Sequence, residues 1–331
     1  MKKKLFLILV FFIVFLLLPF KIFLLKRPYG VSEKIEWGLV FSKFHSIEMG
    51  LDWEEAYLAI VDDLKPKSLR LPFYWQDIEQ SRGVYNFADY DWMINEASKR
   101  NIKITLVVGR KIPRWPECHL PDWALSLDEE EQKKEILAFI SEAVGRYKKV
   151  NSLYAWQVEN EPFLSFGECP KLDAKFLDKE IETARFIDPN HPIIITDSGE
   201  LSVWLRAAKR ADIFGTTMYR IIWNKYLGYV EYPLPPKFFW IKANLVRLFY
   251  PDKPIIVSEL QAEPWGPKHS YEMTLEEQFK SMSIERFKDN MNYARQVGFP
   301  EVYLWGAEWW YWLKTKHGDA RFWNEAKSML E

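Results

Sequence analysis

Eight strand-length apolar runs, each followed by an amphipathic or helix-like stretch, limit the possible folds of this chain more than any other feature. The runs are short and rich in β-branched and aromatic residues, as strands buried on both faces usually are. Apolar residues within 130–147 recur at the spacing of one helix face. The predicted strands are 37–41, 68–71, 103–108, 153–158, 192–196, 213–217, 254–258 and 302–305.

This alternation predicts an α/β protein built as a (β/α)8 TIM barrel, because each strand is followed by a helix that can pack outside it. No Gly-rich phosphate loop follows the first strand, which disfavours an open dinucleotide-binding sheet. A length of 331 residues suits one such barrel and is too short for two. The predicted helices are 53–64, 89–100, 130–147, 174–187, 236–249, 275–297 and 320–330.

The N-terminal residues have a different composition. Lys2, Lys3 and Lys4 precede an apolar run over 5–20, which resumes after Lys21. This run can form a membrane span of roughly 20 residues, with the Lys21 side chain reaching the interface. Ala, Ser and Gly, the residues typical of a signal-peptide cleavage site, are absent between residues 5 and 28. The pattern favours an uncleaved transmembrane signal anchor over a cleaved signal peptide, which would give a secreted protein.

We therefore expect three parts: an anchor over 1–27, a linker over 28–35 and a catalytic barrel over 36–331. The N-terminal lysines favour a cytoplasmic N-terminus and an extracytoplasmic barrel close to the membrane. The aromatic and Pro-rich segment 219–250 could cover a substrate cleft, lie against the bilayer, or simply pack on the barrel.

Two glutamates follow strands four and seven of the predicted barrel. Glu161 ends the run Trp156-Gln157-Val158-Glu159-Asn160-Glu161, and Glu259 ends Ile255-Ile256-Val257-Ser258-Glu259. Active-site groups of such barrels come from the C-terminal ends of strands, so these two carboxylates can face each other across a sugar. Glycoside hydrolysis needs such a pair, one protonated and one ionised. Competing glutamates with weaker positions are Glu159, Glu263, Glu301 and Glu308.

The chain resembles the clan A glycoside hydrolases, a superfamily of retaining β-glycosidases and β-glycanases, over nearly all of 36–330. The most specific element is the Asn-Glu pair after strand four, which is similar to the superfamily's motif. The resemblance implies that Glu161 is the general acid/base, that Glu259 is the nucleophile and that Asn160 binds the substrate's 2-hydroxyl group. No cofactor and no metal are expected.

Three further positions fit the resemblance. Arg70 on strand two resembles the arginine that supports the nucleophile, and Tyr219 after strand six resembles the tyrosine that donates a hydrogen bond to it. Trp305 on strand eight resembles the tryptophan that forms the floor of the sugar site. Core packing is the alternative role for each of these residues.

The chain departs from the pattern after strand three, where many members of family 5 have a histidine. Arg110 stands there, and it can either bind substrate hydroxyl groups or pair with a carboxylate; His119 is a weak substitute for the histidine. Aromatic faces can also stack on sugar rings. Candidate sugar platforms, each equally suited to core packing, are Trp75, Trp115, Trp265, Trp309 and Trp310.

The only two cysteines are Cys118 and Cys169, which excludes a Cys-rich zinc site and a disulfide framework. They follow strands three and four, so adjacent loops could bring them within bridging distance in an oxidising compartment. Two unpaired thiols are the equally weighted alternative.

With a formal net charge of -1, the chain has no overall basic field to attract nucleic acid. The expected partners are an oligosaccharide, polysaccharide or glycoconjugate substrate and a membrane. Two other functions remain open from the sequence: a transglycosylase that uses the same residues, and a catalytically silent carbohydrate-binding barrel. The sugar, the linkage and the choice between internal and terminal cleavage do not follow from these patterns.

Overall fold

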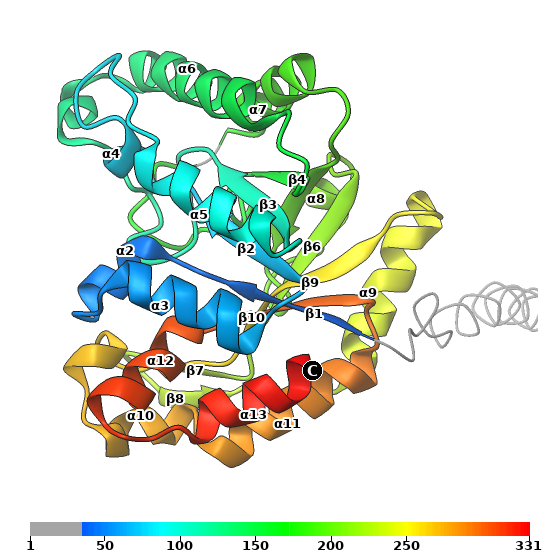
Figure 1. Ribbon diagram of the computed structural model, residues 1–331. Coiled ribbons are helices and arrows are strands. Elements are labelled where there is room, and N and C mark those ends of the chain that lie inside the picture. The colour runs from blue at the N-terminus through cyan, green and yellow to red at the C-terminus, as the bar shows by residue number, and fades with distance from the viewer. Residues whose placement is uncertain (1–34, 172) are drawn as a thin grey trace, which may run out of the picture.

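The computed structural model describes residues 35–171 and 173–331, which fold around one closed barrel of parallel strands (Figure 1). Around the barrel the strand order is β1-β10-β9-β6-β5-β4-β3-β2. Each barrel strand therefore pairs with the barrel strands that come before and after it in the sequence, and β1 pairs with β10 to close the barrel. The eightfold barrel predicted from the sequence is therefore confirmed. Its strands are β1 (Glu36–Val40), β2 (Ser68–Pro72), β3 (Lys103–Val108), β4 (Leu153–Val158), β5 (Ile193–Asp197), β6 (Ile213–Met218), β9 (Ile255–Gln261) and β10 (Glu301–Trp305).

Helices follow every barrel strand and surround the barrel (Figure 1). Short helical turns also occur at Ile60–Leu64, Asp122–Ser126 and Ser270–Glu272. The α-helices are α2 (Lys43–Glu48), α3 (Trp53–Ala59), α4 (Trp75–Ile78), α5 (Ala88–Lys99), α6 (Glu129–Tyr147), α7 (Ala174–Ile187), α8 (Leu205–Ala208), α9 (Pro236–Phe249), α10 (Leu275–Ser281), α11 (Ile284–Val297), α12 (Ala307–Lys316) and α13 (Arg321–Leu330).

The predicted strand bounds agree with the structure to within one residue at each end, except in β9. This strand continues to Gln261, whereas the prediction ended it at residue 258. It is longer because its late residues still pair with both neighbours: Glu259 lies opposite Thr217 of β6, and Gln261 lies opposite Trp305 of β10. Glu259 therefore lies inside the strand rather than just after it.

The single helix predicted over 275–297 is wrong at its middle, where the chain forms α10 and α11. Met282 and Ser283 leave the helical conformation, with φ and ψ of -144° and 80° at Met282 and of -82° and 168° at Ser283. The Ser283 side chain then accepts a hydrogen bond from the backbone N–H of Arg286 and so starts a new helix. Serine favours such capping positions because its side chain competes for nearby backbone groups.

Segment 219–250 contains an antiparallel hairpin that the sequence analysis did not predict, formed by β7 (Ile221–Asn224) and β8 (Gly228–Glu231), followed by α9. Trp223 from the hairpin and Tyr232 just after it line the pocket described below. Two of the alternatives for this segment therefore hold in different parts of it: its hairpin end lines the cleft, whereas α9 packs on the barrel through Phe239, Ala243 and Val246.

Apolar side chains alternate between two buried clusters along the barrel strands. On β5, Ile193 and Ile195 belong to the large cluster between strands and helices, whereas Ile194 belongs to a smaller cluster with Val40 and Ile256. Side chains that point inward fill the interior of such a barrel, so the barrel is a packed core and not a pore. It forms a rigid base for side chains at its rim.

The predicted signal anchor over 1–27 lies outside the described residues, as does almost all of the linker. Within 35–171 and 173–331, the structure contains no helix with the length and apolar character of a membrane span.

Candidate active site

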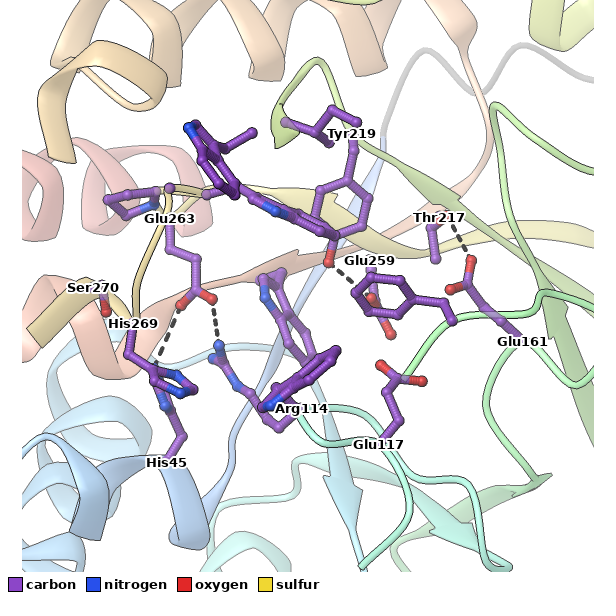
Figure 2. A pocket seen from close by; sticks show the side chains of 18 of the residues that line it. His45, Arg114, Glu117, Glu161, Thr217, Tyr219, Glu259, Glu263, His269 and Ser270 are labelled. Atoms are coloured by element: carbon purple, nitrogen blue, oxygen red, sulfur yellow. Dashed lines mark hydrogen bonds and ion pairs between the residues drawn. The ribbon is translucent and has the colours of Figure 1, made fainter. Parts of the chain in front are cut away.

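A pocket of about 660 Å³ lies at the carboxyl ends of the barrel strands (Figure 2). Its lining includes side chains from β9 and β10 and from the segments that follow β3, β4, β5 and β6. This volume is within the usual range of sites for small molecules. Glu161 and Glu259 both line the pocket, as the barrel position of their strands predicts.

Glu259 is buried, and both of its carboxylate oxygens accept hydrogen bonds. Arg70 Nη1 donates to Oε1 at 2.8 Å, and the Tyr219 hydroxyl donates to Oε2 at 3.0 Å. Burial and the nearby Glu259 charge raise the pKa of Tyr219 well above its usual value, so this hydroxyl stays a donor. A cation and a neutral donor therefore hold the two oxygens of this carboxylate in place.

Glu161 has the opposite environment. Its backbone N–H donates to Thr196 Oγ1 at 2.9 Å, and its Oε1 accepts a hydrogen bond from Thr217 Oγ1 at 2.9 Å. Burial, followed by the charges of Glu259 and Glu117, raises the pKa of Glu161 well above its usual value. The protonated form is therefore favoured. One carboxyl group that holds a proton and one that is ionised are the pair that acid-assisted displacement at a sugar requires.

Arg70 connects the end of β4, which precedes Glu161, to β9, which carries Glu259. Besides Glu259, it donates to Gln157 Oε1 at 2.7 Å and to Asn160 Oδ1 at 3.0 Å, and it is 1% exposed. The planar guanidinium thus orients β4 and β9 side chains together. The Asn160 amide nitrogen donates a long hydrogen bond to Glu117 Oε2 at 3.4 Å. Asn160 therefore lies between Arg70 and the carboxyl group of Glu117.

Glu159, a competing candidate beside the catalytic pair, has a structural role. Its two oxygens accept hydrogen bonds from the backbone N–H groups of Arg110 and Lys111, both at 2.7 Å. This carboxylate therefore supports the backbone of the loop after β3. Glu159 and Glu161 both have positive φ, 59° and 41°, a conformation that non-glycine residues adopt rarely and that clusters at functional sites.

Glu117 is a third carboxyl group in the pocket that the sequence analysis missed. It is 6% exposed and lies 3.7 Å from Lys111 Nζ. Burial, opposed by Lys111 and reinforced by Glu259, raises its pKa to about 8. The neighbouring Cys118 forms a disulfide bond with Cys169, with a Cα–Cα distance of 5.3 Å. The sequence carried one signal for Glu117, its position next to a cysteine expected near the strand-four loop.

A second polar cluster lies beside these carboxylates; the sequence analysis named its Glu263 and Glu308 as competing candidates but missed Arg114 and His45. Arg114 pairs with Glu263 and with Glu308, the latter at 3.2 Å, and its guanidinium lies 3.9 Å from the centre of the Trp305 ring. His45 Nε2 lies 3.9 Å from Glu263 Oε2. Arg114 and His45 come from loop and helix positions without strand periodicity, so the strand pattern could not reveal them.

Two of the proposed sugar platforms, Trp115 and Trp265, line the pocket, as does Trp305, the proposed floor of the sugar site. Trp305 is 6% exposed and carries Arg114 on one face, whereas Trp115 is 45% exposed. Trp265 packs edge-on against Tyr219 with ring centres 5.2 Å apart, and Phe166 lies between Trp265 and Trp115. These aromatic faces lie beside the carboxylates, where a sugar ring could stack.

Trp75 and Trp309 are not sugar platforms. Trp75 is 1% exposed, and its Nε1 donates to Glu79 at 2.6 Å; Trp309 is fully buried and donates to Gln278 at 2.6 Å. Trp310 is also fully buried. Each is a core residue whose indole N–H is satisfied internally, so its face cannot meet a ligand.

Arg110 does not belong to the substrate site, which corrects one of its two predicted roles. Its guanidinium pairs with Glu129 of α6 at 3.0 Å and also contacts Gln132, and the side chain is 3% exposed. It therefore takes the second role, pairing with a carboxylate. His119 is also buried, and its Nε2 contacts the carbonyl oxygen of Arg114 at 3.0 Å.

Within the residues that the structure describes, no group of three or more His, Cys, Asp or Glu side chains is arranged to hold a metal ion.

Comparisons with known proteins match parts of this chain to glycoside hydrolases. A family model described as Glycosyl hydrolase family 10 matches residues 73–215, a range that includes β4, Asn160 and Glu161 but neither Arg70 nor Glu259. Endo-1,4-beta-xylanase 3 of Hypocrea jecorina is 27% identical over 161 residues, and endo-1,4-beta-xylanase 2 of Claviceps purpurea is 28% identical over 126 residues. These matches cover 45% and 36% of this chain. The chain spans less than half the length of these relatives, 44% and 37% respectively.

Solved structures share the fold at low identity. Native xylanase 10B from Thermotoga maritima has a TM-score of 0.53 and 18% identity, and the match covers 85% of this chain and 86% of that one. A cold-adapted β-galactosidase from Rahnella sp. R3 has a TM-score of 0.60 and 12% identity, with coverage of 92% and 57%. The family 10 match along the sequence and the shared barrel together make this chain a member of the clan A glycoside hydrolase superfamily, whose catalytic domain is a (β/α)8 barrel.

Proposed function

We propose that this chain is a retaining β-glycoside hydrolase that acts by double displacement. The observation that carries the proposal is the contrast between two buried glutamates in one pocket. Glu259 accepts hydrogen bonds from the Arg70 cation and the Tyr219 hydroxyl, whereas burial and nearby charges raise the pKa of Glu161 and keep a proton on it. Nucleophile and acid differ in this way in retaining glycosidases.

In the first step, a Glu259 oxygen forms a bond to the anomeric carbon while the bond from that carbon to the leaving-group oxygen breaks. Glu161 transfers its proton to the departing oxygen, so the leaving group departs as a neutral alcohol. Arg70 and the Tyr219 hydroxyl hold Glu259 in position for this attack. The product of the step is a glycosyl ester of Glu259.

In the second step, water attacks the same carbon and the ester bond to Glu259 breaks. Glu161, now ionised, removes a proton from the water and returns to its starting state. Two inversions at one carbon give net retention. In this mechanism the two carboxyl groups act about 5 to 5.5 Å apart, whereas inverting enzymes separate them further.

For the substrate we propose a β-1,4-linked glycan, with xylan as the first polymer to test. The support is the xylanase names of the partial sequence relatives. Trp115, Trp265 and Trp305 add aromatic faces on which successive sugar rings could stack.

Azide rescue tests the mechanism. A panel of 4-nitrophenyl and 2,4-dinitrophenyl β-glycosides, including the xyloside, glucoside, galactoside and mannoside, first identifies the substrate. With that substrate, Glu259→Ala should lose nearly all turnover, and azide should restore it by direct attack, giving an α-glycosyl azide. Glu161→Ala should keep its kcat/KM on the dinitrophenyl leaving group, whose departure needs no proton. Its release of the glycosyl ester should be slow with water and fast with azide, which gives a β-glycosyl azide.

Glu130→Ala is the matched control, because Glu130 is an exposed carboxylate on α6 that does not line the pocket. It should turn over like the unmodified chain and give no glycosyl azide. Normal activity of Glu259→Ala, or the same azide anomer from both active-site variants, would contradict the assignment of the two roles.

A further inference from the structure

The loop after β3 holds the Glu117 carboxyl group inside the pocket. Figure 2 shows this group pointing toward Glu259, on the opposite side of the view from Tyr219. Its nearest polar neighbours are Lys111 Nζ at 3.7 Å and Asn160 Nδ2 at 3.4 Å, both longer than a strong hydrogen bond. Neither contact satisfies the carboxyl group as fully as Arg70 and Tyr219 satisfy Glu259.

The backbone around Glu117 is fixed by several independent contacts. Its N–H donates to the carbonyl of Arg114 at 2.7 Å, and its carbonyl accepts from Ile112 at 2.7 Å. Its φ is +74°, which non-glycine residues rarely adopt. The next residue forms the disulfide to Cys169, so the loop is also tied to the segment after β4.

The opposite segment leaves room for the Glu117 side chain. A Cβ atom on Gly167 would lie 2.6 Å from Glu117 Cβ and 2.7 Å from the carbonyl oxygen of Pro116, so no larger residue fits there without a shift. Gly167 itself has a φ of +86°. A strained backbone at Glu117, a glycine that permits the close approach of the opposite segment, and a disulfide at the next residue all fix this one side chain. Packing alone does not explain why that side chain is a buried carboxyl group.

Burial of this group beside other carboxylates is unfavourable for folding. Burial and the Glu259 charge raise the pKa of Glu117 to about 8, against the opposing effect of Lys111. Near neutral pH the group is therefore mainly protonated, with one O–H donor and remaining acceptor capacity. Such a group can both donate to and accept from a sugar hydroxyl, and a costly buried acid in a pocket is a candidate for function.

We propose that Glu117 binds the 3-hydroxyl group of the sugar whose anomeric carbon Glu259 attacks. The inference rests on the proposed function and on the predicted role of Asn160 at the 2-hydroxyl. Because Asn160 and Glu117 are adjacent side chains, the hydroxyl that Glu117 meets is the next one along the ring from the 2-position. The site selects sugars with a free 3-hydroxyl and rejects those modified there by an ester, an ether or a further glycosidic bond.

A substrate and variant cycle tests this contact. The aryl β-glycoside that the azide experiment identifies is compared with its 3-deoxy and 2-deoxy analogues, in the unmodified chain and in Glu117→Ala. In the unmodified chain we expect the 3-deoxy change to lower kcat/KM by roughly 10- to 100-fold, the usual effect of a lost hydroxyl contact in a polar site. In Glu117→Ala, most of that penalty should disappear, because the partner is already missing.

The 2-deoxy penalty is the internal control. It should stay the same in Glu117→Ala, since Asn160 and Glu259 remain. Glu117→Gln keeps the shape and a donor, so it should retain more activity on the parent sugar than Glu117→Ala. It also provides the folded comparison if the alanine variant proves unstable. Thermal unfolding followed by circular dichroism identifies the folded variants.

Equal 3-deoxy penalties in the unmodified chain and in the folded variants would overturn the subsite, since a purely structural role lowers activity on both sugars alike. This result differs from failure of the proposed function, in which neither azide anomer forms with Glu259→Ala or Glu161→Ala. If Glu117→Ala instead loses the 2-deoxy penalty and keeps the 3-deoxy penalty, Glu117 contacts the 2-hydroxyl group and the proposal is rejected.

Discussion

At the scale of single residues, Glu117 links function to stability. A pKa of about 8 in the folded chain, against about 4.5 when unfolded, means that the folded state binds an extra proton between these pH values. The stability that this proton gives is complete below pH 4.5 and is lost as the pH rises through 8. Burial is the largest cause of the shift, so removal of the ionisable group should remove the effect.

Glu117→Gln should therefore unfold less readily at pH 8 than the unmodified chain. The free energy of unfolding of the variant minus that of the unmodified chain should increase between pH 4.5 and pH 8, by on the order of a few kcal/mol. Urea unfolding at a series of pH values measures this. A difference that stays constant between pH 4.5 and 8 would show that Glu117 does not hold an extra proton in the folded chain.

The main residues of the site follow from the sequence where strand periodicity fixes them. Glu161, Glu259 and Arg70 lie on or just after predicted strands, and the barrel converges such positions at one rim. Glu117 and Arg114 could not be found in this way. They lie in the loop after β3, where positive φ values of 74° and 92° and a disulfide, rather than a repeating pattern, direct the side chains.

At the scale of elements, the barrel was predictable because its strands are buried on both faces and its helices have one apolar face. The predicted elements are wrong where a local hydrogen bond or a pairing partner, rather than periodicity, determines the secondary structure. Ser283 ends and restarts a helix that periodicity alone would continue. The β7–β8 hairpin depends on pairing between its own two short strands, and its mixed aromatic and polar residues gave no clear alternation.

The loops after β3 and β4 are joined by the Cys118–Cys169 disulfide, which closes a segment with a sequence separation of 51. Replacement of both cysteines by serine should lower the free energy of unfolding by about 2 to 4 kcal/mol, because the unfolded chain gains freedom. It should also lower kcat/KM on the aryl glycoside, since Glu117 precedes Cys118. Urea unfolding and steady-state kinetics measure the two effects.

For this pair of measurements, the unmodified chain treated with a reductant under native conditions is a useful control. If the double variant has unchanged activity on the parent sugar, the disulfide stabilises the fold but does not position Glu117.

At the scale of the whole molecule, the apolar segment over 5–25 leads us to propose that the barrel is held at a membrane surface, outside the cytoplasm. The full chain should stay in the membrane pellet after an alkaline carbonate wash, and its N-terminal sequence should begin before residue 5. Release into the wash, with an N-terminus after residue 27, would instead indicate a cleaved signal peptide and a secreted enzyme.

The central claim for the whole molecule is that its two carboxyl groups act as an acid/base and a nucleophile across one pocket. The most direct measurement is covalent trapping with a 2,4-dinitrophenyl 2-deoxy-2-fluoro-β-glycoside of the substrate sugar, followed by peptide mass spectrometry. The 2-fluoro group slows release of the glycosyl ester, so the intermediate accumulates. We predict one added glycosyl group per chain, on Glu259, with no label in Glu259→Ala. A label on a different carboxylate, or hydrolysis of the parent glycoside with inversion at the anomeric carbon, would contradict the account.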